Sequence, residues 1–193
     1  MQAEPIAKFN EWFAAAKAHS AIADATAMSL ATADAQGKPS VRIVLLKAVD
    51  ERGFVFYTNM ESRKSREITQ NPKVALCFHW PPLERQVRIE GHAAQVNDAE
   101  ADAYFARRPR ESQIGAWASK QSHFLSGREE LQAATASVAE RFAGKDIPRP
   151  DFWSGWRVTP DMVEFWQQGD FRLHDRDVYR RTATGWEVSR LYP

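Results

Sequence analysis

Cysteine is almost missing from this sequence, since Cys77 is the only one in 193 residues. A single cysteine excludes an intramolecular disulfide and a cysteine-based zinc cage. It lies in the apolar stretch VALCF, so we expect a buried small hydrophobic side chain there. The chain also lacks an excess of one charge, with 26 Lys and Arg against 25 Asp and Glu. General polyanion binders usually carry a clear cationic excess, so we expect no nucleic-acid partner.

Long apolar runs and targeting signals are missing too. No stretch approaches the roughly 20 apolar residues that cross a bilayer. The N-terminus, MQAEPIAKFNEWF, has no basic start followed by an apolar core, which a secretory signal would need. The sequence therefore predicts a cytoplasmic protein that does not associate with a membrane.

The signature motifs of several enzyme classes are absent. There is no G-x-S-x-G, no P-loop and no G-x-G-x-x-G, so serine hydrolases, P-loop nucleotidases and Rossmann dehydrogenases lose their main support. No H-E-x-x-H or other paired-histidine spacing links the five histidines, and we expect no metal site.

What is present is a pattern of short strands with inserted helices. Helices are expected over 5–22, 61–70 (with Ser62 as its N-cap), 98–109 (capped by Asn97 or Asp98) and 123–144. Strands are expected over 27–34, 40–49, 53–58, 73–80, 83–96, 154–159, 162–167 and 178–192, the last with a turn at 183–185. Short turns join successive strands, and such connections favour antiparallel pairing because parallel strands need a longer crossover. We therefore predict a mainly β, α+β fold: one domain, 1–193, forming an antiparallel barrel with peripheral helices and an N-terminal helix (1–22) packed on it.

Basic residues gather in small groups in this otherwise neutral chain. Such groups indicate discrete phosphate or carboxylate pockets, and the alternative is a solvated surface paired with glutamates. Ser62, Arg63 and Lys64 stand at a predicted helix start, where free N–H groups favour an anion. Arg42 and Lys47 lie five residues apart on one predicted strand, so they would face opposite sides. Both can reach one ligand only if it wraps an edge or the strand bulges.

Arg172, His174 and Arg176 alternate in the segment EFWQQGDFRLHDRDVY. On a strand these three side chains would share one face. Their charges repel one another unless an anion or an electron-rich ring lies among them, so the pattern favours a site. The alternative is a surface strand with scattered charge.

Several ordered blocks from about residue 25 to the C-terminus together resemble one enzyme family. They are RIVLLK (42–47), FYTN (56–59), SRKSREI (62–68), LERQVRIEG (83–91), YFARRPRESQIGAWASKQS (104–122), FWSGWRV (152–158), VEFWQQGDFRLHDR (163–176) and a terminal RLYP. The sequence is similar in these blocks to the pyridoxamine (pyridoxine) 5′-phosphate oxidases, which are FMN enzymes of vitamin B6 cofactor synthesis.

The resemblance implies a split β-barrel that forms a homodimer, with FMN at the subunit interface. The implied FMN contacts are Arg42, Ile43, Val44, Leu45, Leu46, Lys47, Tyr57, Thr58, Arg63, Lys64, Gln86, Gln121, Ser122, Trp166 and Arg176, some of them from the opposite subunit. The implied substrate-phosphate site is Lys47, Tyr104, Arg108 and Ser112. Arg172 and His174 would hold the substrate's pyridine ring over the flavin and are the implied catalytic residues.

The implied reaction is the oxidation of pyridoxine or pyridoxamine 5′-phosphate to pyridoxal 5′-phosphate. Dioxygen would be the acceptor, hydrogen peroxide a by-product, and ammonia a further product from the amine. One alternative is a related split-barrel flavin oxidase with another aromatic substrate, such as those of phenazine biosynthesis, against which the complete substrate-phosphate set argues. Another is a non-catalytic flavin- or haem-binding protein, which would not need Arg172 and His174.

Overall fold

Nine antiparallel strands form one sheet in the computed structural model, which describes residues 5–193. The main path of the sheet runs β2-β1-β5-β6-β7-β4-β3, and β8 and β9 extend from β7 as a hairpin. The strands are β1 (Ala27–Ala33), β2 (Pro39–Leu45), β3 (Ala48–Asp50), β4 (Gly53–Asn59), β5 (Lys73–Trp80), β6 (Arg85–Gln95), β7 (Trp153–Gln167), β8 (Asp175–Thr182) and β9 (Gly185–Arg190).

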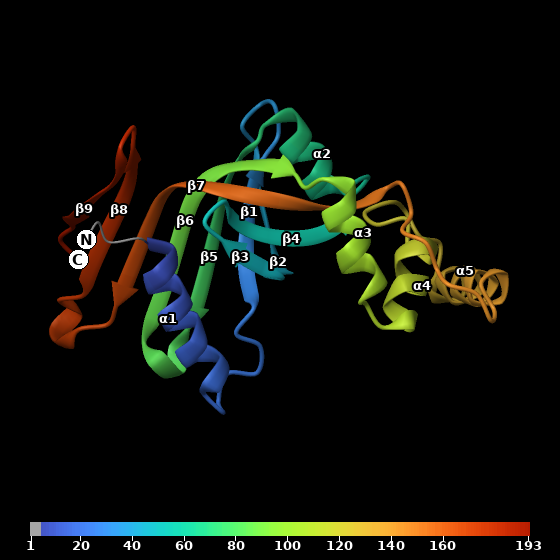
Figure 1. Ribbon diagram of the computed structural model, residues 1–193, viewed down its shortest axis with the longest axis horizontal. Coiled ribbons are helices and arrows are strands. Elements are labelled where there is room, and N and C mark those ends of the chain that lie inside the picture. Colours follow the sequence, from blue (N-terminus) through green and yellow to red (C-terminus); the bar gives the residue numbers. More distant parts are fainter. Residues whose placement is uncertain (1–4) are drawn as a thin grey trace.

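The long strand β7 supports two branches of this sheet (Figure 1). β6 pairs along one edge of β7, whereas the other edge pairs first with β4, over 153–158, and then with β8, over 162–167. A register shift after Glu90 places Gly91 opposite Pro160. A Cβ atom on Gly91 would lie 2.1 Å from the Thr159 carbonyl oxygen, so only glycine permits this close approach. The sheet therefore bends at this point and curls into a half-barrel.

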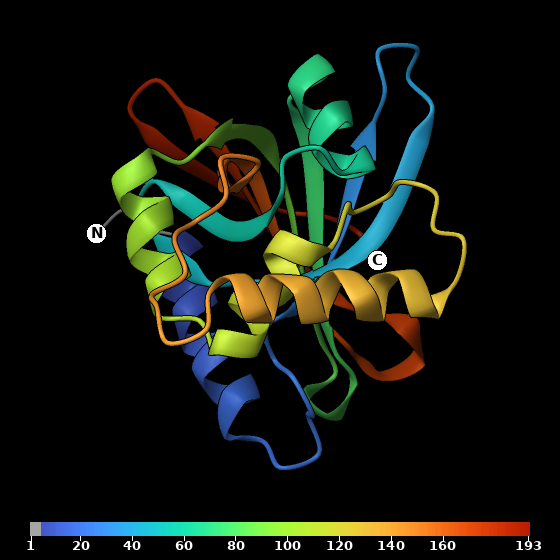
Figure 2. The ribbon, with the colours of Figure 1, turned by 90° about the vertical axis from the view of Figure 1, so that its right-hand side faces the viewer.

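Helices cover one face and one end of the sheet: α1 (Pro5–Ala18), α2 (Arg63–Gln70), α3 (Asp98–Ala106), α4 (Arg110–Ala118) and α5 (Arg128–Arg141). α1 buries Phe9, Trp12 and Ala16 in the core, and Phe9 meets Phe54 of β4 edge-on with ring centroids 4.9 Å apart. Helices α3 to α5 gather at the end of the molecule opposite the β8–β9 hairpin (Figure 1). Figure 2 shows α5 lying across that end.

The predicted antiparallel, mainly β fold with peripheral helices is confirmed. Its predicted single-domain extent, 1–193, stays a prediction, and residues 1–4 lie outside the described part of the chain. Within residues 5–193, no helix is long and apolar enough to cross a membrane.

Some predicted boundaries were wrong. The strand predicted over 40–49 is two strands, because the N–H of Leu46 donates to Thr26 O (2.9 Å) and that of Lys47 to Val55 O (2.8 Å), which turns the chain. The strands predicted over 154–159 and 162–167 are one, β7, since a bulge at Asp161 lets the strand continue past Pro160. The last helix begins only at Arg128, and α4 was not foreseen.

Cys77 was expected to be buried, but it is half-buried, and this burial raises the pKa of its thiol.

Candidate active site

A cavity of about 960 Å³ lies between β2, β4, the start of α2 and the α3–α4 segment, with residues 119–122 also in its wall. Most sequence-predicted site residues line it: Arg42, Ile43, Val44, Leu45, Lys47, Tyr57, Thr58, Arg63, Lys64, Tyr104, Arg108, Ser112, Gln121 and Ser122. Leu46 lies in the core instead, 3% exposed. The predicted cofactor and substrate residues thus share one cavity within one chain.

The turn at Leu46 resolves the five-residue spacing of Arg42 and Lys47. β2 ends at Leu45, and both basic side chains line the same cavity because the chain no longer follows one straight strand between them. Neither a wrapped ligand nor a bulge is needed.

One end of the cavity, which we call the α2 corner, is formed by Arg42 together with Ser62, Arg63 and Lys64 at the start of α2. Ser62 is the N-cap of α2, as predicted, and its hydroxyl accepts from the Ser65 N–H. The Lys64 ammonium donates to Ser62 Oγ (3.1 Å) and to Gln121 Oε1 (2.9 Å). Its third N–H has no partner in residues 5–193, so one donor is free for an anion.

Burial, and secondarily the charge of Arg42, lower the pKa of Lys64 to about 8. The side chain is only 8% exposed. A buried ammonium without a carboxylate partner is unfavourable unless an anion binds beside it.

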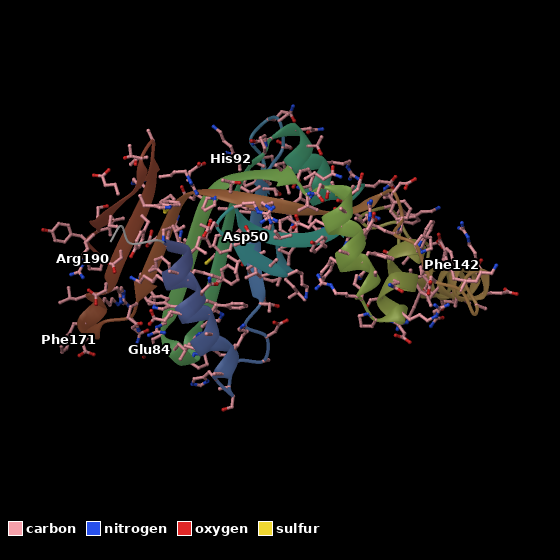
Figure 3. The ribbon with its side chains drawn as sticks, viewed as in Figure 1. Asp50, Glu84, His92, Phe142, Phe171 and Arg190 are labelled. Atoms are coloured by element: carbon pink, nitrogen blue, oxygen red, sulfur yellow. The ribbon has the colours of Figure 1, made fainter. Side chains whose placement is uncertain are left out.

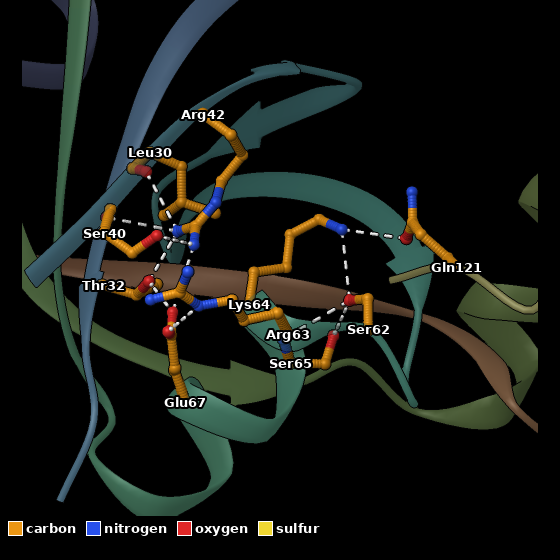
Figure 4. A network of polar contacts seen from close by, with 10 residues as sticks. All are labelled: Leu30, Thr32, Ser40, Arg42, Ser62, Arg63, Lys64, Ser65, Glu67 and Gln121. Carbon is orange, nitrogen blue, oxygen red and sulfur yellow. Dashed lines mark hydrogen bonds and ion pairs between the residues drawn. The ribbon is translucent and has the colours of Figure 1, made fainter. Parts of the chain in front are cut away.

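A buried carboxylate, Glu67, organises the arginines of the α2 corner (Figure 4). Its side chain accepts from Arg42 Nη2 at 3.1 Å, from Arg63 Nε at 2.7 Å and from the Thr32 hydroxyl. Burial raises the pKa of Glu67, but these hydrogen bonds outweigh that effect and the pKa is lowered overall. Glu67 therefore remains ionised and holds the two guanidinium groups on either side of itself.

The other end, the α3–α4 corner, contains Tyr104, Arg108 and Ser112. These residues are spaced four apart, but they do not share one helix: Tyr104 lies in α3, Arg108 lies between the helices, and Ser112 lies in α4. Pro109 is the N-cap of α4, since proline is tolerated at a helix start but not inside one. All three side chains still line the cavity.

Aromatic rings form the wall next to Arg108. Tyr57 and Tyr104 stack in parallel with ring centroids 4.0 Å apart, and the Trp153 ring is parallel to both. Burial raises the pKa of both tyrosines, so they are neutral hydrogen-bond donors at physiological pH. A cavity with a cationic group at each end and flat rings in its wall suits an anionic ligand that carries a ring.

The remaining predicted residues lie elsewhere, in what we call the turn cluster: Gln86, Trp166, Arg172, His174 and Arg176. Gln86, Trp166 and Arg176 are direct neighbours across β6, β7 and β8. The turn that follows β7 is at the end of the molecule remote from α3 and α4, as the position of Phe171 in Figure 3 shows. None of the five lines the cavity of its own chain.

The predicted strand face of Arg172, His174 and Arg176 was wrong. β8 begins only at Asp175, and Arg172 ends a 3₁₀ turn, Asp170–Arg172, with a left-handed φ of 66°. The N–H of Gly169 donates to His174 Nδ1 (3.2 Å), so the neutral imidazole carries its proton on Nε2. The exposed Arg172 side chain has no partner in residues 5–193 and is free to bind an anion or a ring.

Several residues that line or organise the cavity were not predicted, and two of them, Glu67 and Trp153, determine which cations are paired. The i, i+4 spacing of Glu67 from Arg63 was a visible signal for their ion pair. Trp153, which lines the cavity beside Arg108, has no local signal, because strand pairing and not sequence proximity places it there.

The curled antiparallel sheet defines a split-barrel protein, and its cavity carries the cationic groups and flat rings that suit an anionic, ring-bearing small molecule. Comparison with known proteins narrows this class. Residues 14–142 match the family described as "Pyridoxamine 5′-phosphate oxidase", and residues 153–193 match its "Pyridoxine 5′-phosphate oxidase C-terminal dimerisation region". The chain therefore belongs to the pyridoxamine 5′-phosphate oxidase family, and the C-terminal match indicates a homodimer.

Curated relatives match over nearly the whole chain. The pyridoxine/pyridoxamine 5′-phosphate oxidase of Anaeromyxobacter dehalogenans is 58% identical, covering 98% of this chain and 96% of its own. The enzyme of the same name from Sphingopyxis alaskensis is 56% identical, and the match covers 100% of this chain and 89% of that protein. Among solved structures, PhzG from Burkholderia lata, in complex with tetrahydrophenazine-1-carboxylic acid, has a TM-score of 0.93 at 33% identity, covering 98% and 93%. An FMN-binding protein from Nostoc punctiforme, at 16% identity and a TM-score of 0.78 over both full chains, shares the fold.

Proposed function

We propose that this protein oxidises pyridoxine 5′-phosphate and pyridoxamine 5′-phosphate to pyridoxal 5′-phosphate, with FMN as cofactor and dioxygen as acceptor. The observation that carries the proposal is the single cavity with two separate cationic ends, since the reaction needs one phosphate site for the cofactor and one for the substrate. The curated relatives named for this activity support it.

The α2 corner fits the phosphate of FMN. Lys64 offers a free N–H to the phosphate. Glu67 fixes the guanidinium groups of Arg42 and Arg63 in the same corner. Ser122 is close by in the cavity wall. The backbone of 42–47 with Tyr57, Thr58 and Gln121 would follow the ribityl chain and one edge of the flavin.

The α3–α4 corner fits the phosphate of the substrate. Arg108 Nη1 is buried without a hydrogen-bond partner in residues 5–193, which is the condition expected of a group that awaits an anion. Tyr104, Ser112 and Lys47 also line the cavity and would complete the site.

The turn cluster would reach the flavin of the second protomer. Gln86, Trp166 and Arg176 form one cross-strand row, and the C-terminal region that contains two of them matches a dimerisation region. Arg172 and His174 would then lie over the substrate ring, with the His174 Nε2–H as a donor. This arrangement accounts for side chains that serve no purpose in their own chain's cavity.

FMN, held by the α2 corner, would supply the redox chemistry: hydride acceptance from C4′ of the substrate and transfer of the electrons to dioxygen. The protein's part is to hold C4′ at a fixed position, and the two ends of the cavity do this by binding both phosphates. Arg172 places positive charge near the substrate's oxygen or nitrogen, which favours loss of its proton. His174 orients the ring through its Nε2–H.

An anaerobic titration tests this function. The FMN-loaded protein is mixed with pyridoxine 5′-phosphate without oxygen, and the visible flavin band is followed. Bleaching of the band, with pyridoxal 5′-phosphate appearing in step, is the expected result. A flavin that binds but stays oxidised would refute the proposed substrate. The PhzG-like alternative would then be tested with a reduced phenazine carboxylic acid, the kind of compound in the PhzG complex.

A further inference from the structure

Arg108 is a half-buried arginine whose positive charge is not balanced by a carboxylate in the described part of the chain. It has no carboxylate partner in residues 5–193, and its Nη1 atom is buried without a hydrogen bond. Burial lowers the pKa of Arg108, an effect that Tyr104 only partly offsets. Arg42, at the opposite end of the cavity, is by contrast paired with Glu67 at 3.1 Å. Something other than an ion pair must therefore stabilise the Arg108 guanidinium.

Two aromatic rings provide that support. The guanidinium carbon of Arg108 lies 4.7 Å from the ring centroid of Trp153 and 5.5 Å from that of Phe105. The two rings meet edge-on, with centroids 5.0 Å apart, and both side chains are almost fully buried. A guanidinium over an indole face is attracted electrostatically without using any of its N–H donors. The donors of Arg108 are therefore left for a ligand.

The backbone of Trp153 is firmly held, and its ring stacks parallel to those of Tyr57 and Tyr104. Arg149 Nη1 donates to the Trp153 carbonyl at 2.8 Å, and the same guanidinium binds Asp98 and Asp102 of α3. Trp153 is the first residue of β7, paired with Asn59 of β4. The indole thus lies at a fixed place between the sheet and the helix that carries Tyr104.

We infer that Trp153 is a positioning residue for substrate phosphate, acting through Arg108. Its indole face keeps the guanidinium flat, desolvated and without a counter-ion, so that the full charge is directed at an incoming phosphate. A carboxylate in its place would hold Arg108 equally well but would compete with the anion. The inference rests on the proposed function, in which this corner binds substrate.

The test compares Trp153→Phe and Trp153→Leu with the wild-type, FMN-loaded protein. The Phe variant keeps an aromatic face and the Leu variant keeps only apolar volume. For pyridoxamine 5′-phosphate, Trp153→Leu is expected to raise KM about fivefold to tenfold with kcat changed less than about twofold, and Trp153→Phe is expected to fall between it and the wild type. The inhibition constant of inorganic phosphate should rise in parallel.

Unphosphorylated pyridoxamine separates positioning from general damage. Because it has no phosphate for Arg108, its kcat/KM should be the same in Trp153→Leu and in the wild type. Trp117→Leu is the matched control: Trp117 lies in the same apolar cluster and carries Arg141 over its ring at 4.9 Å, but it does not line the cavity. This variant should leave the KM for pyridoxamine 5′-phosphate unchanged.

Three results would overturn the inference: an unchanged KM in Trp153→Leu, equal losses with both substrates, or a Phe variant as impaired as the Leu variant. If the wild-type protein fails to oxidise pyridoxamine 5′-phosphate, the proposed function fails separately. Direct calorimetry of inorganic phosphate binding to the wild type and to Trp153→Leu then still decides the role of Trp153, since equal affinities would refute it.

Discussion

The lowered pKa of Lys64 predicts a specific pH dependence of FMN binding. In the cofactor-free protein this pKa is about 8, because the ammonium is buried and lies near Arg42. The FMN phosphate is a dianion above a pKa of about 6, and its charge would favour the protonated lysine in the complex. Above pH 8, binding must therefore take up a proton.

The size of the effect follows from the fraction of free protein that is protonated. One pH unit above its pKa, about one Lys64 in eleven carries the proton, so the Kd for FMN should rise about twofold from pH 7 to pH 8 and about tenfold from pH 7 to pH 9. The stability of the cofactor-free protein should change in the opposite sense. Below pH 8 the folded protein must hold a buried ammonium at Lys64, which lowers its free energy of unfolding. This destabilisation is lost as the pH rises from about 8 to 10.5, the ordinary pKa of lysine.

Quenching of flavin fluorescence at pH 7 to 9, where the FMN phosphate is already a dianion, measures the Kd. Lys64→Met, which has no titrating group, should bind FMN more weakly at pH 7 and show a flat profile over the same range. Riboflavin, which has no phosphate, should bind the wild type with little dependence on pH. A flat wild-type profile with FMN, or the same slope in Lys64→Met, would refute the reasoning.

Other substitutions test separate parts of the site and fold. Arg172→Ala should lower kcat about a hundredfold while FMN stays bound, and retained turnover would remove Arg172 from its catalytic role. Arg108→Ala should raise the KM for pyridoxamine 5′-phosphate at least tenfold; an unchanged KM would count against a phosphate ligand. Glu67→Gln should weaken FMN binding but not riboflavin binding, and an equal loss would indicate general damage instead. Gly91→Ala should destabilise the protein by about 2 kcal/mol or more in thermal unfolding, because its Cβ would meet the Thr159 carbonyl at 2.1 Å; an unaltered Tm would contradict the tight bulge.

Local pattern was enough to predict most of the sheet. The turn residues and apolar alternation placed β1, β4, β5 and β6 to within a few residues. Local pattern gave the wrong result where hydrogen bonds to distant segments determine the course of the backbone. VRIVLLK reads as one strand, and only the bonds from Leu46 to Thr26 and from Lys47 to Val55 show that it turns.

The same limit applies to the site. Arg172 and His174 alternate as on a strand, but the bond from Gly169 to His174 folds that segment into a turn with left-handed backbone. The basic residues of the cavity could be named from the sequence, because charge is a local property. The pairing of Glu67 with Arg42 and the position of Trp153 beside Arg108 could not be predicted, since tertiary packing determines which charges are neutralised and which are left free.

The separation of the cavity from the turn cluster has a genetic consequence. If each site combines the cavity of one protomer with Arg172 of the other, defects in the two regions fall into two complementation groups. A mixed dimer of Arg108→Ala and Arg172→Ala chains would contain one doubly defective site and one intact site. Random reassociation makes about half of all dimers mixed, so two impaired proteins would together recover about a quarter of wild-type activity at low substrate concentration. Two alleles from the same group would recover none.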